Sequence, residues 1–261
     1  DIDSAYKAIV EFDRPCAIAL KHNTPCGIGI SNNIADAYLR CYDVDSKSIF
    51  GGVVILNREV NEVLAKKLNE TFLEIIIAPS YTKEALEEFS KKTNLRIIEG
   101  NFDIDNYTDN QLRSVRGGYL TQTSGIDEFV LDNVTNTVID DDTKARLGML
   151  YKAVKNVKSN AVVIGQEDLI LGISGGMVSR VNACEHALKA AINNVKYQKD
   201  KPLLLASDGF FPFNDIVQIA KKNNIKYIIQ PGGSLNDDKF IEECNKNDIG
   251  SIFTKVRFFR H

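Results

Sequence analysis

Short, β-rich apolar runs alternate with helical patterns along most of the chain, and this alternation limits the folds that the sequence can adopt. Strands that alternate with helices pair into parallel or mixed sheets whose faces the helices cover. The sequence therefore predicts an α/β protein with mixed sheets, helices outside and two lobes. The predicted strands are 16–20, 50–56, 73–78, 95–98, 161–164, 169–173, 203–206 and 225–230, and the predicted helices are 3–12, 33–45, 59–70, 82–92, 144–157, 178–195, 215–223 and 237–245.

The alternation is interrupted once, by polar stretches rich in Asn and Asp. We interpret residues 101–142 as a β-rich connecting region between a first lobe over 1–100 and a second lobe over 143–261. The segments 73–79 and 227–232 each contain a strand followed by proline, which suggests that the two lobes are related.

Composition excludes several classes of partner. The formal net charge is −3 and the pI is near 5.7, so the chain has no basic field to hold nucleic acid. The five cysteines are odd in number and scattered, without a C-x-x-C motif, which favours reduced thiols. No apolar stretch approaches membrane-spanning length, and the first residues lack a signal-peptide pattern. We expect a cytoplasmic protein with neither a nucleic-acid nor a membrane partner.

The segment Lys21–Gly27 carries the most chemistry. It follows the predicted buried strand 16–20, and its Pro and Gly force a turn, so Lys21 and His22 are expected at that strand's carboxyl end. Ligands bind at this edge of α/β sheets. His22 can accept a proton while Lys21 faces developing negative charge, an arrangement suited to acyl chemistry. A surface lysine beside a turn-capping histidine is the alternative.

Other polar residues lie at the ends of predicted elements. Gly51 would let a ligand approach the backbone closely, or would form a tight turn. Asn160 has the donors and acceptor to orient an amide or an imidazole, or belongs to a helix-end polar cluster. Glu74 interrupts an apolar strand and needs a partner, either a substrate hydroxyl or a basic neighbour.

Aromatic and basic residues near the carboxyl-terminal strands suit a flat, anionic ligand. Ser207–Phe213 sets three aromatic residues beside Asp208 after a buried strand, which predicts either a ligand platform or core packing. Arg257 suits phosphate recognition, or is simply solvated. Gly172–Met177 leads into the predicted helix 178–195, whose first turn holds Arg180, but its spacing matches no nucleotide-binding pattern.

The ligand spacing argues against zinc. Zinc deaminases pair an H-x-E segment with a later P-C-x-x-C. No Glu stands two residues after His22, and no Cys stands three residues after Cys26. We expect no bound metal, and a zinc-dependent nucleoside deaminase remains an alternative that requires stoichiometric zinc.

Taken together, these segments resemble one family, the AICAR transformylases, which form part of a bifunctional purine-biosynthesis enzyme that also carries IMP cyclohydrolase. They occur in the family's order and cover essentially the whole chain. The matching segments are Lys21–Gly27, Ser48–Gly52, Phe72–Pro79, Val157–Ala161, Ser179–Val181, Ser207–Phe213, Gln230–Ser234 and Arg257–His261.

The resemblance implies two cytidine-deaminase-like α/β/α lobes without the deaminase zinc. It also implies a homodimer whose active sites lie at the subunit interface. The implied reaction moves a formyl group from the co-substrate formyl-tetrahydrofolate to the exocyclic amine of AICAR, giving formyl-AICAR in IMP biosynthesis.

The resemblance further implies roles for individual residues. His22 is the implied general base, Lys21 the transition-state stabiliser and Asn160 an orienting hydrogen-bond partner. The implied nucleotide contacts are Gly51, Glu74, Phe210 and Arg257, and the implied folate contacts are Arg180, Asp215, Ser234 and Leu235.

The chain departs from the family pattern in three ways. We expect the chain to lack the cyclohydrolase domain, and also the R-Y-G-x-N-P-H-Q segment that opens the transformylase domain. Before Arg180, Ser174 replaces a usual Gly and Met177 a usual Gln. We expect a fragment whose partner is the missing N-terminal part or cyclohydrolase domain. A non-catalytic nucleotide-binding or assembly module is the other alternative.

Overall fold

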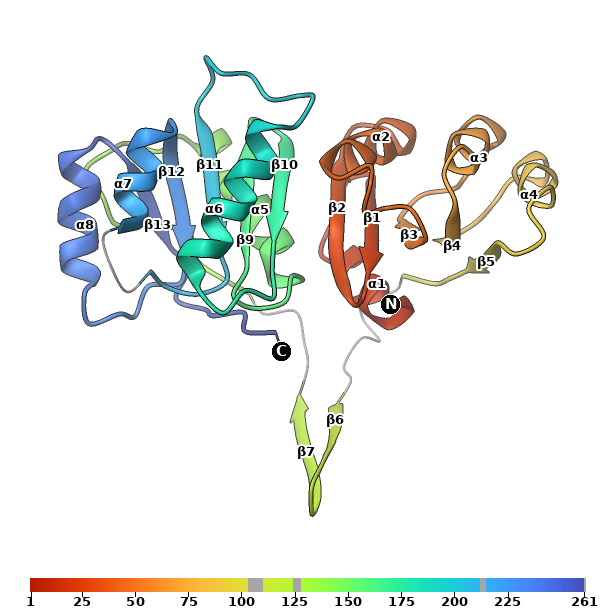
Figure 1. Cartoon of the computed structure of the whole chain (residues 1–261), viewed down its shortest axis with the longest axis horizontal. Coiled ribbons are helices and arrows are strands. Elements are labelled where there is room, and N and C mark those ends of the chain that lie inside the picture. The colour runs from red at the N-terminus through yellow and green to blue at the C-terminus, as the bar shows by residue number, and fades with distance from the viewer. Residues whose placement is uncertain (103–109, 124–127, 212–214, 261) are drawn as a thin grey trace.

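The computed structural model describes residues 1–102, 110–123, 128–211 and 215–260. These residues form two lobes that lie side by side, each built around its own sheet, with the edge strands β2 and β10 facing each other (Figure 1). A two-stranded hairpin projects between the lobes on the side where both termini lie. The predicted α/β architecture with mixed sheets is confirmed.

The first lobe has a five-stranded sheet in the order β2-β1-β3-β4-β5. Strand β1 is antiparallel to both of its neighbours, whereas β3, β4 and β5 are mutually parallel. The strands are β1 (Cys16–Lys21), β2 (Thr24–Ile30), β3 (Gly52–Leu56), β4 (Leu73–Ala78) and β5 (Arg96–Glu99), and the helices are α1 (Ile2–Ile9), α2 (Ile34–Val44), α3 (Glu62–Asn69) and α4 (Lys83–Phe89).

The second lobe repeats this strand order as β10-β9-β11-β12-β13 and adds β8 beyond β13. Strand β9 is antiparallel to both neighbours, and β11, β12 and β13 are parallel. The strands are β8 (Asp132–Asn133), β9 (Val162–Gln166), β10 (Leu169–Ser174), β11 (Leu203–Ser207), β12 (Ile225–Gln230) and β13 (Gly250–Phe253), and the helices are α5 (Asp141–Lys155), α6 (Arg180–Ile192), α7 (Asp215–Lys222) and α8 (Asp237–Lys246).

Strand β2 is absent from the strands predicted above. Its Pro25, Gly27 and Gly29 are typical of loops, and they occur here because β2 is an edge strand against which α2 packs. Pro25 lies at the beginning of the strand, where an edge position tolerates a missing N–H. The glycines let the helix backbone approach, because a Cβ on Gly29 would overlap the carbonyl oxygen of Ala37.

Replacing Gly29 by alanine should therefore destabilise the protein by about 1–3 kcal/mol, the usual cost of overpacking. The added methyl would push α2 away from its sheet. Gly148→Ala is the matched control: its Cβ would meet Leu131 at 3.8 Å, and alanine favours the α5 helix, so this variant should be slightly more stable. Urea unfolding measures both, and equal stabilities would contradict the packing argument.

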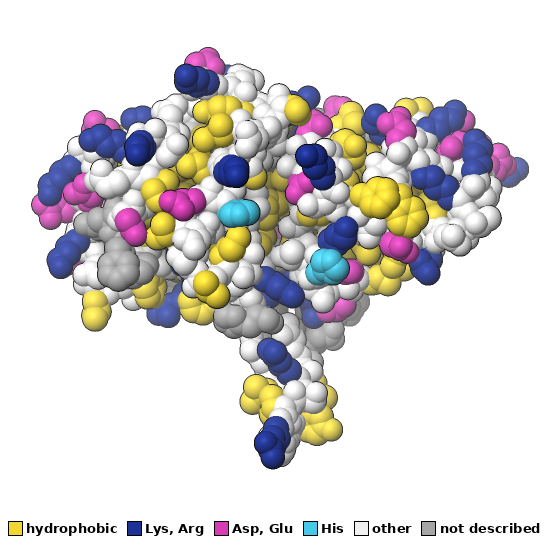
Figure 2. All heavy atoms as spheres, in the orientation of Figure 1, with side chains coloured by type: hydrophobic (Ala, Val, Ile, Leu, Met, Phe, Trp, Pro, Cys, Tyr) yellow, Lys and Arg dark blue, Asp and Glu magenta, His cyan; other side chains and the backbone are white. Residues whose placement is uncertain are grey.

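The projecting hairpin pairs β6 (Asn110–Val115) with β7 (Gly118–Thr123). It falls within the predicted connecting region, whereas β8 of the same region joins the second sheet. Leu112, Tyr119 and Leu120 are more than half exposed, and Figure 2 shows hydrophobic side chains standing out on this hairpin.

Within the described parts of the chain, no helix has both the length and the apolar character needed to cross a membrane. Those residues also contain no group of three or more His, Cys, Asp or Glu side chains suited to a metal ion.

Candidate active site

Lys21 and His22 belong to a tight β-hairpin turn between β1 and β2. Lys21 pairs with Thr24, which leaves His22 and Asn23 as the two turn residues. Both have positive φ, 56° and 60°. Two left-handed residues make the hairpin turn that matches the twist of the strands, and Asn is favoured there. The turn thus holds an exposed imidazole at a fixed place beside the lysine.

The turn lies at the edge of the sheet where the parallel strands begin. The turn does lie at the carboxyl end of β1, but β1 is antiparallel to β3, with Leu20 opposite Val53. Lys21 and His22 therefore lie beside the amino ends of the parallel strands. The predicted position at the carboxyl end of strand 16–20 is confirmed, but the general rule for parallel strands does not apply to it, because β1 is antiparallel to β3.

The predicted residue Gly51 lies next to Lys21. The Lys21 ammonium donates to the carbonyl of Phe50 at 2.8 Å. Gly51 has φ 70°, and its N–H donates to the carbonyl of Phe72 at 2.7 Å, two residues before Glu74 on β4. Lys21, Gly51 and the beginning of β4 are thus brought together at one edge.

Glu74 has a basic neighbour. Its carboxylate accepts from the Arg96 guanidinium at 2.9 Å, and both side chains are substantially exposed. The contact matches the second interpretation of Glu74 given above, a basic neighbour as its partner. A substrate-binding role for Glu74 remains a prediction.

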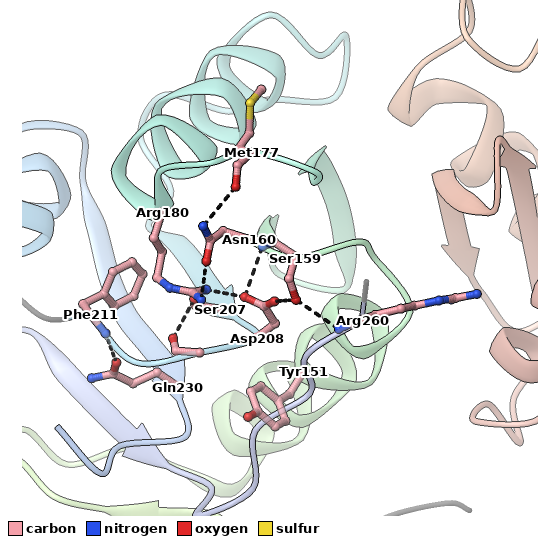
Figure 3. A network of polar contacts seen from close by, with 12 residues as sticks. Tyr151, Ser159, Asn160, Met177, Arg180, Ser207, Asp208, Phe211, Gln230 and Arg260 are labelled. Atoms are coloured by element: carbon pink, nitrogen blue, oxygen red, sulfur yellow. Dashed lines mark hydrogen bonds and ion pairs between the residues drawn. The ribbon is translucent and has the colours of Figure 1, made fainter. Parts of the chain in front are cut away.

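In the second lobe, polar side chains converge on the buried carboxylate of Asp208 (Figure 3). Asp208 follows the carboxyl end of β11 and accepts from the Ser159 hydroxyl at 2.5 Å and the Ala161 N–H at 3.1 Å. It also forms an ion pair with Arg180, whose side chain is only 10% exposed. A buried charge of this kind is stable only because it is paired and hydrogen-bonded.

Arg180 links Asp208 to Asn160. Its guanidinium donates to the Asn160 carbonyl oxygen at 2.7 Å and to the Ser207 hydroxyl at 2.8 Å. The Asn160 amide in turn donates to the carbonyl of Met177 at 2.9 Å. The Asn160 side-chain oxygen therefore faces Arg180 and its NH2 group faces the Met177 carbonyl. An orienting residue requires a fixed amide of this kind.

Phe210 and Arg257 also come together. The Arg257 guanidinium lies over the Phe210 ring, 5.4 Å from its centroid, which is a cation–π contact. The loop that carries Phe210 is held by Gln230, whose side-chain oxygen accepts from the N–H of Phe211 at 2.8 Å. Both residues sit on loops that follow parallel strands, so in this lobe the site obeys the carboxyl-edge rule.

The remaining predicted folate contacts lie on the surface. Asp215 begins α7 and is exposed, and Leu235 is fully exposed after β12. The Ser234 hydroxyl accepts from the N–H of Asn236 at 3.1 Å. Residues 212 and 213 of the aromatic motif, and His261 of the final motif, lie outside the described residues.

Two contacts bring the site segments of the lobes to the same side of the molecule. The N–H of Lys158, two residues before Asn160, donates to the Thr24 hydroxyl, two residues after His22, at 3.3 Å. A second connection runs through Arg260 and is described below. Asp208, the centre of the second-lobe cluster, was not among the predicted site residues; the available signal was a carboxylate directly after a buried strand.

The cysteines do not provide a nucleophile. Burial raises the pKa of Cys26 to about 11 and the pKa values of Cys184 and Cys244 to about 12. Cys16 and Cys41 are fully buried, and burial raises their pKa values as well. Because the thiolate is the reactive form, these thiols are inert near neutral pH.

Cys26 should therefore react with iodoacetamide at pH 8 about two orders of magnitude more slowly in the native protein than in urea. A pKa of about 11 leaves far less thiolate at pH 8 than the ordinary value near 8.5. Mass spectrometry of labelled peptides measures the rates. Equal rates in the two states would contradict the raised pKa.

A family model described as the AICARFT/IMPCHase bienzyme matches residues 1–190. The chain belongs to this family. The resemblance seen in the motifs is thereby confirmed.

Similarity to curated relatives extends over the whole chain. The chain is 46% identical over 263 residues to the bifunctional purine biosynthesis protein PurH of Fusobacterium nucleatum subsp. nucleatum. It is 40% identical over 264 residues to the PurH protein of Anoxybacillus flavithermus and to that of Staphylococcus saprophyticus. These alignments cover 100% of this chain but 51–52% of each relative, so the chain spans about half the length of the relatives it matches.

Proposed function

We propose that this chain carries the formyl-transfer activity of its family. It would move a formyl group from formyl-tetrahydrofolate to the exocyclic amine of AICAR, in purine biosynthesis. The observation that carries this proposal is that Lys21 and the exposed His22 lie together at the turn between β1 and β2, on the same side of the molecule as the oriented amide of Asn160. The family match and the names of the relatives support it.

The geometry suits acyl transfer to a weak nucleophile. The AICAR amine is conjugated with its ring, so it benefits from a base, and His22 is the exposed imidazole available to take its proton. Attack on the formyl carbon forms a C–N bond and a tetrahedral oxyanion. The Lys21 ammonium uses one N–H on Phe50, which leaves two to stabilise that oxyanion.

The same proton completes the reaction. As the tetrahedral intermediate collapses, the bond to the folate nitrogen breaks, and protonated His22 returns a proton to that nitrogen. Formyl-AICAR and tetrahydrofolate are the products, and His22 is neutral again. This sequence needs neither a covalent enzyme intermediate nor one of the buried thiols.

Arg257→Ala should weaken AICAR binding by about 1.5–3 kcal/mol, roughly ten- to a hundredfold, and folate binding much less. The reason is that a guanidinium suits the nucleotide's phosphate, and Arg257 is exposed where it stacks on Phe210. Calorimetry with each ligand measures the two affinities. An equal loss for both would contradict the assignment.

The function is tested by mixing the protein, as its gene encodes it, with AICAR and formyl-tetrahydrofolate and measuring tetrahydrofolate release. Binding of AICAR without release would favour the non-catalytic module. Nucleoside deamination with stoichiometric zinc would favour the deaminase.

We further propose that two copies pair, as the family resemblance implies, and that the protein is cytoplasmic. Sedimentation at micromolar concentration tests the pairing, and a strict monomer would contradict it. Folate contacts by Arg180, Asp215, Ser234 and Leu235 remain part of the proposal.

A further inference from the structure

Arg260 reaches from the second lobe to the first. In Figure 3 its side chain extends away from the cluster around Asp208 toward the first lobe. The structure gives its side chain an acceptor in each lobe. Its guanidinium donates to the carbonyl of Asn156 at 2.8 Å and to the hydroxyl of Ser4 on α1 at 2.7 Å.

The backbone of Arg260 is fixed beside the site. Its N–H donates to the Ser159 hydroxyl at 3.0 Å, and its carbonyl accepts from the Ser159 N–H at 2.9 Å. Ser159 directly precedes Asn160 and also donates to Asp208. The backbone from which the Arg260 side chain extends is therefore held against the segment that carries Asn160.

The other end of the contact reaches the turn that carries His22. The buried Ser4 hydroxyl accepts from Arg260 and donates to the side-chain oxygen of Asn23 at 3.2 Å. The Ser4 hydroxyl thus uses an oxygen lone pair toward Arg260 and its proton toward Asn23, so donors and acceptors alternate along the connection. Asn23 is the second residue of the two-residue turn, directly after His22.

We propose that Arg260, Ser4 and Asn23 form a bridge that positions His22 relative to Asn160. We call these three residues the Arg260 bridge. Arg260 is a positioning residue: it contacts the protein rather than the reacting atoms. The catalytic consequence of the bridge rests on the proposed function. If that function holds, a shift of about 1 Å between reacting groups can lower the rate roughly a hundredfold.

Two variants break the bridge at different points in the protein as its gene encodes it. Arg260→Met keeps the apolar stem and removes the guanidinium, and Ser4→Ala removes the central hydroxyl. Arg58→Met is the matched control. Arg58 also donates from its two terminal nitrogens, to the carbonyls of Asn57 at 2.8 Å and Asp13 at 2.5 Å, but both acceptors lie in its own lobe.

In the kinetic test, each bridge variant should lower kcat for formyl transfer about tenfold. KM for AICAR and for the folate should change less than twofold. The double variant should be no worse than Arg260→Met, because both changes break one connection. Wild-type kcat in Arg260→Met, or additive losses in the double variant, would overturn the bridge.

A second readout does not depend on the reaction. In protein with labelled histidine, the His22 imidazole resonance should shift in the same direction in both bridge variants and stay in place in Arg58→Met. Superimposable His22 resonances in all four proteins would overturn the bridge. If the wild type releases no tetrahydrofolate, the proposed function fails, and the resonance alone decides the positioning.

Discussion

Replacing His22 by alanine should lower the rate of formyl transfer by about two to four decades, the usual cost of losing a general base. Nucleotide affinity should stay largely unchanged, because the proposed nucleotide contacts lie on other segments. Single-turnover measurement of tetrahydrofolate release, together with calorimetry for AICAR, separates the two effects. Near-normal turnover would remove His22 from the mechanism.

The turn geometry calls for a second variant. His22 has φ 56°, a conformation that alanine adopts only with strain, so His22→Ala alone confuses loss of the base with distortion of the turn. Asn occupies this conformation readily, as Asn23 does at φ 60°. His22→Asn should therefore lose as much activity as His22→Ala while keeping the hairpin. A largely active His22→Asn variant would assign the loss in His22→Ala to the backbone.

Most of the architecture could be predicted from local pattern. The alternation of apolar runs and helical periods is a local property, and it indicated both sheets and their covering helices. Strand direction is not local: β1 and β9 are antiparallel to the strands beside them because each folds back through a hairpin. The sequence could therefore locate His22 on a turn but could not state which edge of the sheet holds it.

The second-lobe cluster could be predicted in part. Asn160, Arg180 and Asp208 each stood in a motif, but Arg180 and Asp208 are 28 residues apart. Their contact is set by packing of α6 against the sheet, which no local pattern encodes. The Arg260 bridge joins residues even more distant in the sequence, because Arg260 and Ser4 are 256 residues apart.

Comparison of the lobes shows why the cluster occurs in one of them. Asn57 follows β3 as Asp208 follows β11, and its side-chain oxygen accepts from the N–H of Cys16 at 2.8 Å, as Asp208 accepts from Ala161 at 3.1 Å. The Asn57 amide then donates to backbone carbonyls and closes a neutral, structural contact. A carboxylate at the same position requires a cation, and Arg180 supplies it.

Asp208→Asn should lower the free energy of unfolding by about 3–5 kcal/mol, because it leaves the Arg180 guanidinium buried without its counter-charge. The new amide can keep its oxygen toward Arg180 and the Ala161 N–H, but its NH2 would then face the Ser159 hydroxyl, which in the native protein donates to the carboxylate. The loss should be as large in 1 M salt as in 0.1 M salt, since buried pairs are poorly screened. Urea unfolding at the two salt concentrations measures it.

Asp168→Asn provides the matched control, because Asp168 also pairs with an arginine, Arg146, at 3.3 Å, but with side chains 52% and 35% exposed. Exposed pairs contribute about 0–1 kcal/mol, so this variant should be nearly as stable as the wild type. The same substitution thus separates a buried pair from an exposed one. If Asp208→Asn cost no more than Asp168→Asn, the buried carboxylate would not be what holds Arg180, and the orientation of Asn160 would need another source.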